Sequence, residues 1–273
     1  MTEHRTRALV LRSYDQRESD RIVHLYTEQL GRVSVVAKGA RRSKKRFPGK
    51  LESLTVLNAR IVEPRRGAIA RLEGATLVEP FEGLVQPLGR YAIACQFCEL
   101  LDRLAAEREA SAELFEFAMG VLGVLRSDPP DRLLALLLLV KTISRLGYRP
   151  QLASCAMCDE PIAARDAAGF EPRHGGALCP NCRVGGGLMT PGGLLLGLER
   201  GLRSPLRGRA ELNLGPDAVR RLELLTDRFF RFHIGIELRS TAFLRQSLPL
   251  AGGSRLSARS GPQISIRTSQ DPP

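Results

Sequence analysis

Four of the six cysteines form two Cys-x-x-Cys pairs, Cys155 with Cys158 and Cys179 with Cys182, and 20 residues separate the pairs. Each pair can direct two thiolates at one point, and two pairs complete a closed tetrahedron around Zn²⁺. The separation lies at the upper edge of the range for four-thiolate zinc sites. Because a closed ligand set leaves no position for a reacting water molecule, we predict one structural Zn²⁺ with four cysteine ligands.

This metal site would lie in a glycine-rich insert, residues 150–193, for which we expect few core residues. The metal would then hold the insert together. Four unrelated buried cysteines are the alternative interpretation. His174 lies between the two pairs, but the complete cysteine set predicts a surface histidine. A nucleobase deaminase would need a His-x-Glu motif, whereas Gly175 and Gly176 follow His174.

A third pair, Cys95 and Cys98, lies on an apolar helical stripe with Leu88, Tyr91 and Leu101. Small buried cysteines are common at such positions, so we predict core packing rather than metal or redox chemistry.

The second chemical signal is a basic run at residues 38–50, with seven Lys or Arg in thirteen positions and no acidic residue. Cations at this density match a phosphate backbone, and each neutralised phosphate adds a counterion-release contribution to the affinity. A solvated charge run that serves solubility is the alternative. The residues predicted to contact nucleic acid are Arg32, Lys38, Arg41, Arg42, Lys44, Lys45, Arg46 and Lys50.

A further basic arc is predicted on a late helix. It consists of Arg220, Arg221, Arg228 and Arg231. Asp227 stands four residues before Arg231, so an ordinary solvated helix face explains this arc equally well.

Aromatic residues bear on how a nucleic acid would be held. The chain has no Trp, and its first 80 residues contain only Tyr14, Tyr26 and Phe47. Proteins that sequester single strands commonly stack the bases on aromatic rings. We therefore predict that this protein holds strand backbones and leaves base edges free, as strand annealing requires.

The overall charge agrees with a polyanionic partner, either nucleic acid or an acidic membrane surface. The net charge is +12, and residues 1–80 hold 17 basic and 9 acidic residues. The longest apolar run, 133–140, is much shorter than the roughly 20 residues of a membrane span. No signal peptide is recognised, which predicts a cytoplasmic protein with no membrane partner. Neither a Walker loop, a His-Glu-x-x-His motif nor an acidic metal cluster is present, so we predict no catalytic residues and no enzyme.

The order of the predicted elements indicates an α+β chain of several domains. Strands are expected at residues 6–13, 20–27, 32–38, 51–63 and 70–79, and helices from about 88 to 105 and at 112–125, 131–146 and 216–232. Five strands in about 75 residues suit an OB-type barrel or another small barrel or sandwich. The predicted domains are a nucleic-acid-binding barrel (1–80), a helical domain in two parts (81–149 and 194–250), the zinc-binding insert (150–193) and a disordered tail (251–273).

Three segments resemble the bacterial RecO family of DNA repair proteins. They are GRVSVVAKGAR at residues 31–41, LGYRP at 146–150 leading into Cys155-Ala-Met-Cys158, and LRSTAFL at 238–244. The resemblance covers residues 1 to about 245 and implies an N-terminal OB-type barrel followed by a helical domain that carries the four-cysteine zinc insert. Lys38, Arg41, Arg42 and Lys44 match the family's basic hairpin region, and the four cysteines match the zinc ligands of the members that have them.

The resemblance also implies a function in DNA repair and homologous recombination, in the nucleoid. Such a protein binds single- and double-stranded DNA, anneals complementary strands, and works with RecR to load RecA onto DNA coated by single-strand-binding protein. The acidic C-terminal tail of single-strand-binding protein would dock on the helical domain, where Arg132, Lys141 and Arg145 are the nearest basic residues. The alternative is a zinc-ribbon RNA-binding or ribosome-associated protein, for which a barrel and a basic loop would serve equally well.

Overall fold

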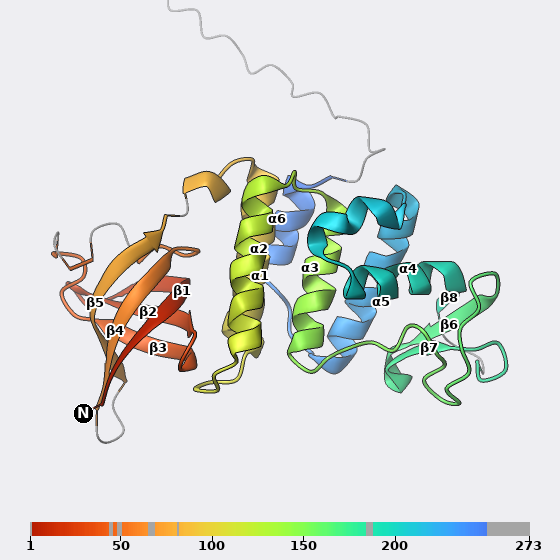
Figure 1. Cartoon of the computed structure of the whole chain (residues 1–273), viewed down its shortest axis with the longest axis horizontal. Helices are drawn as coiled ribbons and strands as arrows, with labels where there is room; N and C mark the ends of the chain where they lie inside the picture. The colour runs from red at the N-terminus through yellow and green to blue at the C-terminus, as the bar shows by residue number, and fades with distance from the viewer. Residues whose placement is uncertain are drawn as a thin grey trace, which may run out of the picture.

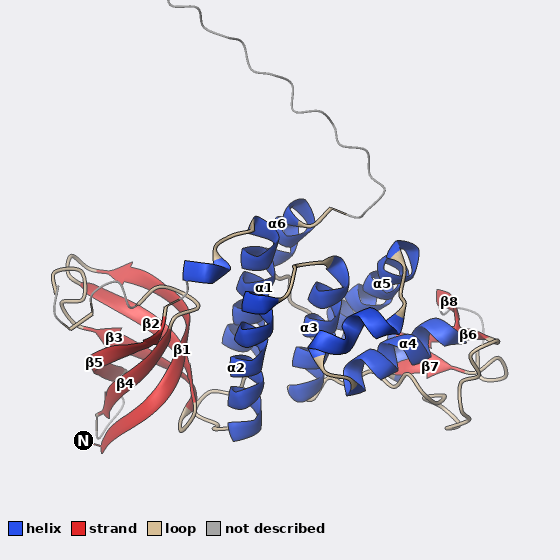
Figure 2. Cartoon of the chain, turned by 45° about the horizontal axis from the view of Figure 1, so that its top comes forward, coloured by secondary structure: helices blue, strands red, loops and turns tan. Residues whose placement is uncertain are grey.

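The computed structural model describes residues 2–249, apart from 44–45, 48–50, 65–68, 81 and 184–187. The predicted tail at 251–273 and the predicted DNA contacts Lys44, Lys45 and Lys50 therefore lie outside the described residues. A β-barrel and a small β-sheet stand at opposite ends of the molecule, with the helices between them (Figures 1 and 2). Among the described helices, none is both long and apolar enough for a membrane span.

The N-terminal domain is a five-stranded barrel of the OB type. Its strands are β1 (Thr2–Gln16), β2 (Asp20–Thr27), β3 (Gly31–Ala37), β4 (Val56–Glu63) and β5 (Ala70–Glu79). They follow the order β1-β2-β3-β5-β4, and β4 pairs with β1 to close the barrel. The neighbours are antiparallel except β3 and β5, which meet in parallel at two residue pairs only.

Strands β1 and β2 are apolar on both faces because they lie between two cores. Val10 and Val23 belong to the interior of the barrel. Leu9, Leu11 and Tyr26 belong instead to the core built mainly by the helices. This double burial explains the unbroken apolar run at the centre of β1, since a strand with one wet face would alternate.

The predicted strand at 51–63 is too long, because β4 begins only at Val56. Leu51 and Leu54 are buried, but they belong to a turn in which Leu54 adopts a φ of 76°. Leu51 packs in the interior of the barrel, and Leu54 packs in the core built mainly by the helices. The Leu54 amide donates to the Val10 carbonyl at 2.7 Å, which ties this turn to β1. The apolar pattern thus identified burial correctly and mistook a turn for a strand.

The helical domain contains α1 (Leu88–Leu104), α2 (Ala112–Ser127), α3 (Arg132–Arg145), α4 (Gly192–Arg203), α5 (Pro216–His233) and α6 (Ser240–Ser247), with 3-10 turns η1 (Glu82–Leu84) and η3 (Leu206–Leu212). Side-chain caps start two of these helices: Ser111 accepts from the Leu114 amide at 3.2 Å, and Asp131 accepts from the Leu134 amide at 2.7 Å. The predicted helices at α1, α2, α3 and α5 are confirmed. Helices α4 and α6 were not predicted; α4 opens on two glycines, and α6 has only eight residues.

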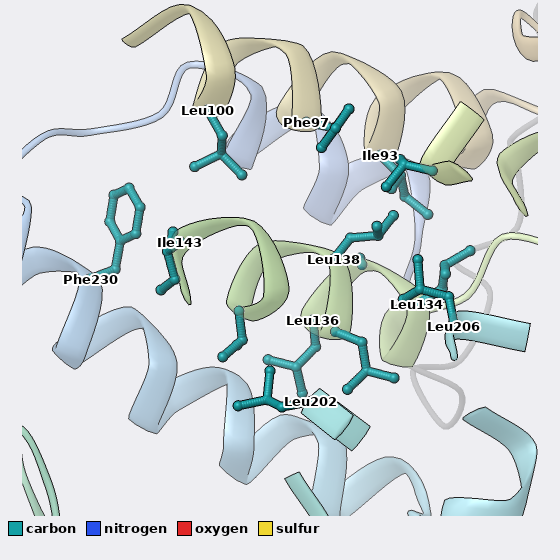
Figure 3. Packing of buried hydrophobic residues seen from close by; sticks show 14 of the residues in the cluster. Ile93, Phe97, Leu100, Leu134, Leu136, Leu138, Ile143, Leu202, Leu206 and Phe230 are labelled. Atoms are coloured by element: carbon teal, nitrogen blue, oxygen red, sulfur yellow. The ribbon is translucent and has the colours of Figure 1, made fainter. Parts of the chain in front are cut away.

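Helix α3 lies at the centre of the helical core. In Figure 3 its side chains Leu134, Leu138 and Ile143 lie among residues of α1, α4 and α5, such as Phe97, Leu202 and Phe230. Because α3 is surrounded on several sides, it is apolar almost all round, as its sequence run of leucines indicates.

The insert has its own three-stranded sheet of β6 (Ala167–Glu171), β7 (Gly176–Leu178) and β8 (Leu188–Pro191), in the order β7-β6-β8, with the turn η2 (Pro172–His174). The expectation of few core residues is wrong: Leu152, Ile162 and Phe170 are buried and continuous with the core of the helices. Phe170 packs against Phe229 of α5 at 6.2 Å between ring centroids. Apolar packing therefore anchors this segment on the helices.

Polar contacts add to the apolar core that β1 and β2 share with the helices, and they attach the barrel to α1, α2 and the loop between them. Arg7 of β1 pairs with Glu28 at 2.9 Å and with Glu116 of α2 at 2.6 Å, and His24 of β2 meets Asp102 of α1 at 2.6 Å. Gly31, where β3 begins, has a positive φ, and a Cβ there would stand 2.0 Å from a carbonyl oxygen of the α1–α2 loop. The two domains thus meet through specific contacts.

Candidate functional sites

The basic loop, residues 38–50, is held against the turn between β1 and β2. The Gly39 amide donates to the Asp20 carboxylate at 2.8 Å, and the Arg41 amide donates to the Ser19 carbonyl at 3.1 Å. The hydrogen bond from Gly39 lowers the pKa of Asp20. The described first part of the loop is therefore attached to a neighbouring hairpin.

The same hairpin supplies the acidic residues that the loop itself lacks. Arg41 meets Asp15 at 3.3 Å, and Arg42 meets Glu18 at 3.5 Å. Both pairs are exposed; the Arg42 side chain keeps 73% of its surface accessible. Exposed pairs of this kind contribute about 0–1 kcal/mol, so a phosphate can replace either carboxylate at little cost.

Arg46 and Lys38 stand side by side in the loop. The Arg46 guanidinium donates to the Lys38 carbonyl at 2.8 Å and lies 5.4 Å from the centroid of the Phe47 ring. Phe47 is buried in the barrel core. The aromatic ring thus anchors the loop, while the Lys38 and Arg46 side chains remain exposed.

Arg32 lies apart from the loop, at the junction of the barrel with the helices. Its Nε donates to the Ala105 carbonyl at 2.8 Å, and Glu107 stands 3.8 Å from its guanidinium. Only 21% of this side chain is exposed. The contacts of Arg32 join two domains, and its predicted contact with DNA stays a prediction.

The aromatic residues of the barrel differ sharply in accessibility. Tyr26 and Phe47 are buried, whereas Tyr14 is 44% exposed. The Arg12 guanidinium lies 5.3 Å from the Tyr14 ring centroid, and His24 meets the ring edge-on. The barrel therefore offers one accessible ring beside a cation, which is little surface for stacking successive bases.

The four cysteines of the insert converge on one point. Their Sγ atoms all lie within 4.8 Å of one another, and Sγ of Cys158 is 3.7 Å from Sγ of Cys179. Tetrahedral Zn²⁺ with Zn–S bonds of about 2.3 Å separates its sulfur ligands by about 3.8 Å, so this donor set fits the ion. Among the described residues, His174 is not part of the cluster.

Backbone amides favour the thiolate form of one of the four cysteines, Cys155. Burial opposes ionisation of Cys155, but the N–H groups of Cys179, Met157 and Cys158 donate to it and lower its pKa to about 6. Cys155 and Cys179 are buried, whereas Cys158 is exposed. The site therefore lies at the surface of the insert, with two of its ligands inside.

The third cysteine pair behaves as predicted. Cys98 is buried in the helical core, and burial raises its pKa well above the usual range. Cys95 is half-buried one turn earlier on α1, and its pKa is also raised by burial. Both thiols stay protonated at neutral pH, which agrees with a packing role.

A groove of about 690 Å³ opens between α1, α3, α5 and α6. Its apolar lining includes Leu136, Leu139, Phe230, Ile236, Leu238 and Leu244, and its cations are Arg132, Arg220, Arg231 and Arg245. The basic arc predicted on α5 is divided: Arg220 and Arg231 line the groove, while Arg221 donates to the Met189 carbonyl of the insert. The groove was not predicted as a unit, because its walls come from distant parts of the chain.

Two of the three basic residues named for tail docking lie elsewhere. Lys141 is buried, and its Nζ donates to the carbonyls of Leu202 and Ser204 at 2.7 Å each. Burial, with the positive Arg145 and Arg149 nearby, lowers the pKa of Lys141 to about 8. Arg145 lies over the Phe117 ring at 4.0 Å. Of the three, only Arg132 lines the groove.

Comparison with known proteins identifies relatives over almost the whole chain. The family model "Recombination protein O N terminal" matches residues 1–81, and "Recombination protein O C terminal" matches residues 86–242. The DNA repair protein RecO of Anaeromyxobacter dehalogenans (strain 2CP-C) is 34% identical over 90% of this chain and 97% of its own length. That of Myxococcus xanthus (strain DK1622) is 35% identical over 88% of this chain and 96% of its own length.

Proposed function

The chain belongs to the recombination protein O family, whose named members act in DNA repair, and we propose from this premise that it anneals complementary DNA strands as a non-enzymatic recombination mediator. In this role it binds single- and double-stranded DNA. It works with RecR to help load RecA onto DNA coated by single-strand-binding protein. The partner roles follow from the family and from the two basic surfaces of this chain.

The observation that carries the proposal is the basic loop on the barrel. Arg41, Arg42 and Arg46 project exposed guanidinium groups from a loop whose base is tied to the β1–β2 hairpin. The weak carboxylate partners of Arg41 and Arg42 leave both guanidinium groups available to phosphates. We include Lys38, Lys44, Lys45 and Lys50 in the same surface. A strand gripped by its phosphates keeps its base edges free to pair, which annealing needs.

The groove in the helical domain supports docking of the acidic tail of single-strand-binding protein. Arginines suit carboxylates because the planar guanidinium binds them in a bidentate manner. The apolar lining suits the side chains of a short peptide. Arg132 and the three groove arginines of α5 and α6 would receive the acidic groups, while Leu136 and Phe230 would contact apolar ones.

We propose that the cysteine cluster holds one Zn²⁺ through Cys155, Cys158, Cys179 and Cys182. With four thiolates the ion supplies cross-linking only, because no coordination position is left for substrate. It joins the loop before β6 to the segment after β7 and so preserves the face that packs on α5.

An annealing assay with two complementary fluorescent oligonucleotides tests the proposal. The protein should accelerate duplex formation over buffer at low salt, for bare strands and for strands coated by the cognate single-strand-binding protein. Coating with a variant that lacks the acidic tail should remove only the second effect. Absence of acceleration on bare strands would contradict annealing, and clear preference for competitor RNA of equal length would favour an RNA-binding role.

A further inference from the structure

Three of the four groove arginines are already paired with carboxylates of the protein itself: Arg132 with Glu223, and Arg231 and Arg245 with Asp227. We propose that Glu223 and Asp227 act as internal competitors for the carboxylates of an acidic peptide, which therefore binds this groove by exchange of ion-pair partners. The inference rests on the proposed function of the groove as a peptide site. It concerns how tightly and how reversibly that site binds.

Glu223 contacts Arg132 with the geometry expected of a carboxylate ligand. Arg132 of α3 donates from Nε to one carboxylate oxygen of Glu223 at 2.6 Å and from its terminal nitrogen to the other at 2.5 Å. The two side chains are only 17% and 22% exposed, so water screens them weakly. Two parallel charge-assisted hydrogen bonds are the strongest contact that an arginine makes with a carboxylate.

Asp227 repeats the arrangement one helical turn further along α5. One of its oxygens lies 3.1 Å from Arg231 on the same helix, and the other lies 3.9 Å from Arg245 on α6. Because α5 and α6 form different walls of the groove, Asp227 lies between cations of both walls. These contacts are looser and more exposed than the pair of Arg132.

Two like charges four residues apart on one helix repel each other and do not stabilise the helix by themselves. The favourable contacts of Glu223 and Asp227 are those with the groove arginines. The groove contains four arginines against Glu223, Asp227 and Glu237, which leaves a net charge of +1. The electrostatic attraction of the groove for an acidic peptide is thus largely cancelled by the carboxylates of the groove itself.

Exchange also keeps the guanidinium groups of Arg132, Arg231 and Arg245 paired at every stage. A partly buried arginine without a partner is costly, so a groove of unpaired arginines would be unstable when empty. With Glu223 and Asp227 in place, each ion pair that the peptide forms replaces an internal ion pair. The free energy that the peptide gains is therefore only the difference between these two similar contacts. The peptide is therefore released easily, and specificity depends on its apolar side chains together with its charge.

The test measures peptide binding by the full chain and by E223Q and D227N. The probe is a short labelled peptide rich in aspartate that ends in phenylalanine with a free carboxylate. A neutral analogue has asparagine for aspartate and an amidated end. We expect each substitution to tighten binding of the acidic peptide by roughly 3- to 10-fold and to leave the neutral analogue unchanged.

E237Q is the matched control, because Glu237 lines the same groove and forms no ion pair within the described part of the chain. It removes the same charge and should change binding less than either test substitution. Unchanged or weaker binding of the acidic peptide by folded E223Q and D227N would overturn the inference. Equal tightening of both peptides would also overturn it, since that result indicates a loosened groove.

Failure of the underlying function gives a different result. If wild type and all three variants bind neither peptide, the groove is not a peptide site, and the proposed docking fails with the inference. If wild type binds the acidic peptide and the variants bind it no better, only the internal competition is wrong. Should E223Q fail to fold, D227N decides the matter, because its pairs are more exposed.

Discussion

The basic loop of the barrel and the groove of the helical domain both concentrate arginine, yet they present it in opposite ways. In the loop, Arg41 and Arg42 reach acidic residues of a neighbouring hairpin through long, exposed contacts of 3.3 and 3.5 Å. In the groove, Arg132 is held by Glu223 in a short bidentate pair, among apolar side chains. Charge of one sign is therefore presented in two ways, which in the proposed function suit two kinds of anion.

The comparison indicates that the surroundings of an arginine, more than the number of arginines, determine which kind of anion suits it. Exposed, loosely paired cations suit a polymer with many equivalent phosphates, and binding of this kind weakens steeply with salt. Enclosed and firmly paired cations suit a short ligand that brings carboxylates and apolar groups together. The molecule keeps these two kinds of surface on different domains (Figure 1).

The largest effect is expected when the charges of the basic loop are removed, because this tests directly whether the loop binds DNA. Replacing Arg41, Arg42, Lys44 and Lys45 by alanine should reduce affinity for single-stranded DNA by about 100-fold or more at low salt. The log–log salt slope should fall in magnitude by up to about 3, as expected when four phosphate contacts are lost. Fluorescence anisotropy across salt concentrations measures both quantities, and binding of the acidic peptide should not change.

The control for that experiment removes Arg5, Arg60 and Arg71, which lie on β1, β4 and β5 of the same barrel. If DNA binding depends on the basic loop, this control variant should keep most of the log–log salt slope of the wild type. An equal loss in both variants would mean that DNA responds to net charge alone.

Metal loss should affect the helical end of the molecule more than the barrel. Replacing Cys155 and Cys179 by serine should release the ion and destabilise the insert by a few kcal/mol, because the buried residues that pack on α5 lose their cross-link. Calorimetry should show a lower melting temperature for the helical transition, while DNA binding by the barrel is retained. C95S should keep its zinc, and an unchanged melting temperature in the metal-free variant would contradict a structural role.

The smallest effect concerns Lys141, a buried cation whose ammonium group donates to two backbone carbonyls. Its pKa is about 8 in the folded protein and near 10.4 in an unfolded chain, so the unfolded state binds more protons between these values. This group therefore makes stability rise with pH from about 8 to 10.4, by at most about 1.4 kcal/mol per pH unit. Denaturant titrations of K141M should lack that contribution, and an identical pH profile in both proteins would argue against a depressed pKa.

Much of the fold was predictable because its signals are local. The strand at 20–27 was predicted with the bounds that β2 has, since a short run rich in Val, Ile, Leu and Thr between polar turns indicates a strand directly. The insert was predicted less well. Its glycines suggested a segment without a core, but Gly176 is required because a Cβ there would stand 2.0 Å from the Gln151 carbonyl oxygen. Phe170 and Ile162 then pack on helices that lie far away in the chain.

By itself, the sequence determined the four-cysteine cluster, the basic composition of the loop and the family. The cysteine cluster follows from the two Cys-x-x-Cys spacings, because each spacing brings two thiolates together. The basic character of the loop follows from composition, which does not depend on folding. Only the tertiary structure decided which charges meet. Arg41 pairs with Asp15 of another hairpin, Arg132 pairs with Glu223 91 residues away, and Lys141 is buried against the end of α4. Electrostatic partners depend on distance in space, and that distance is set by packing of the whole chain.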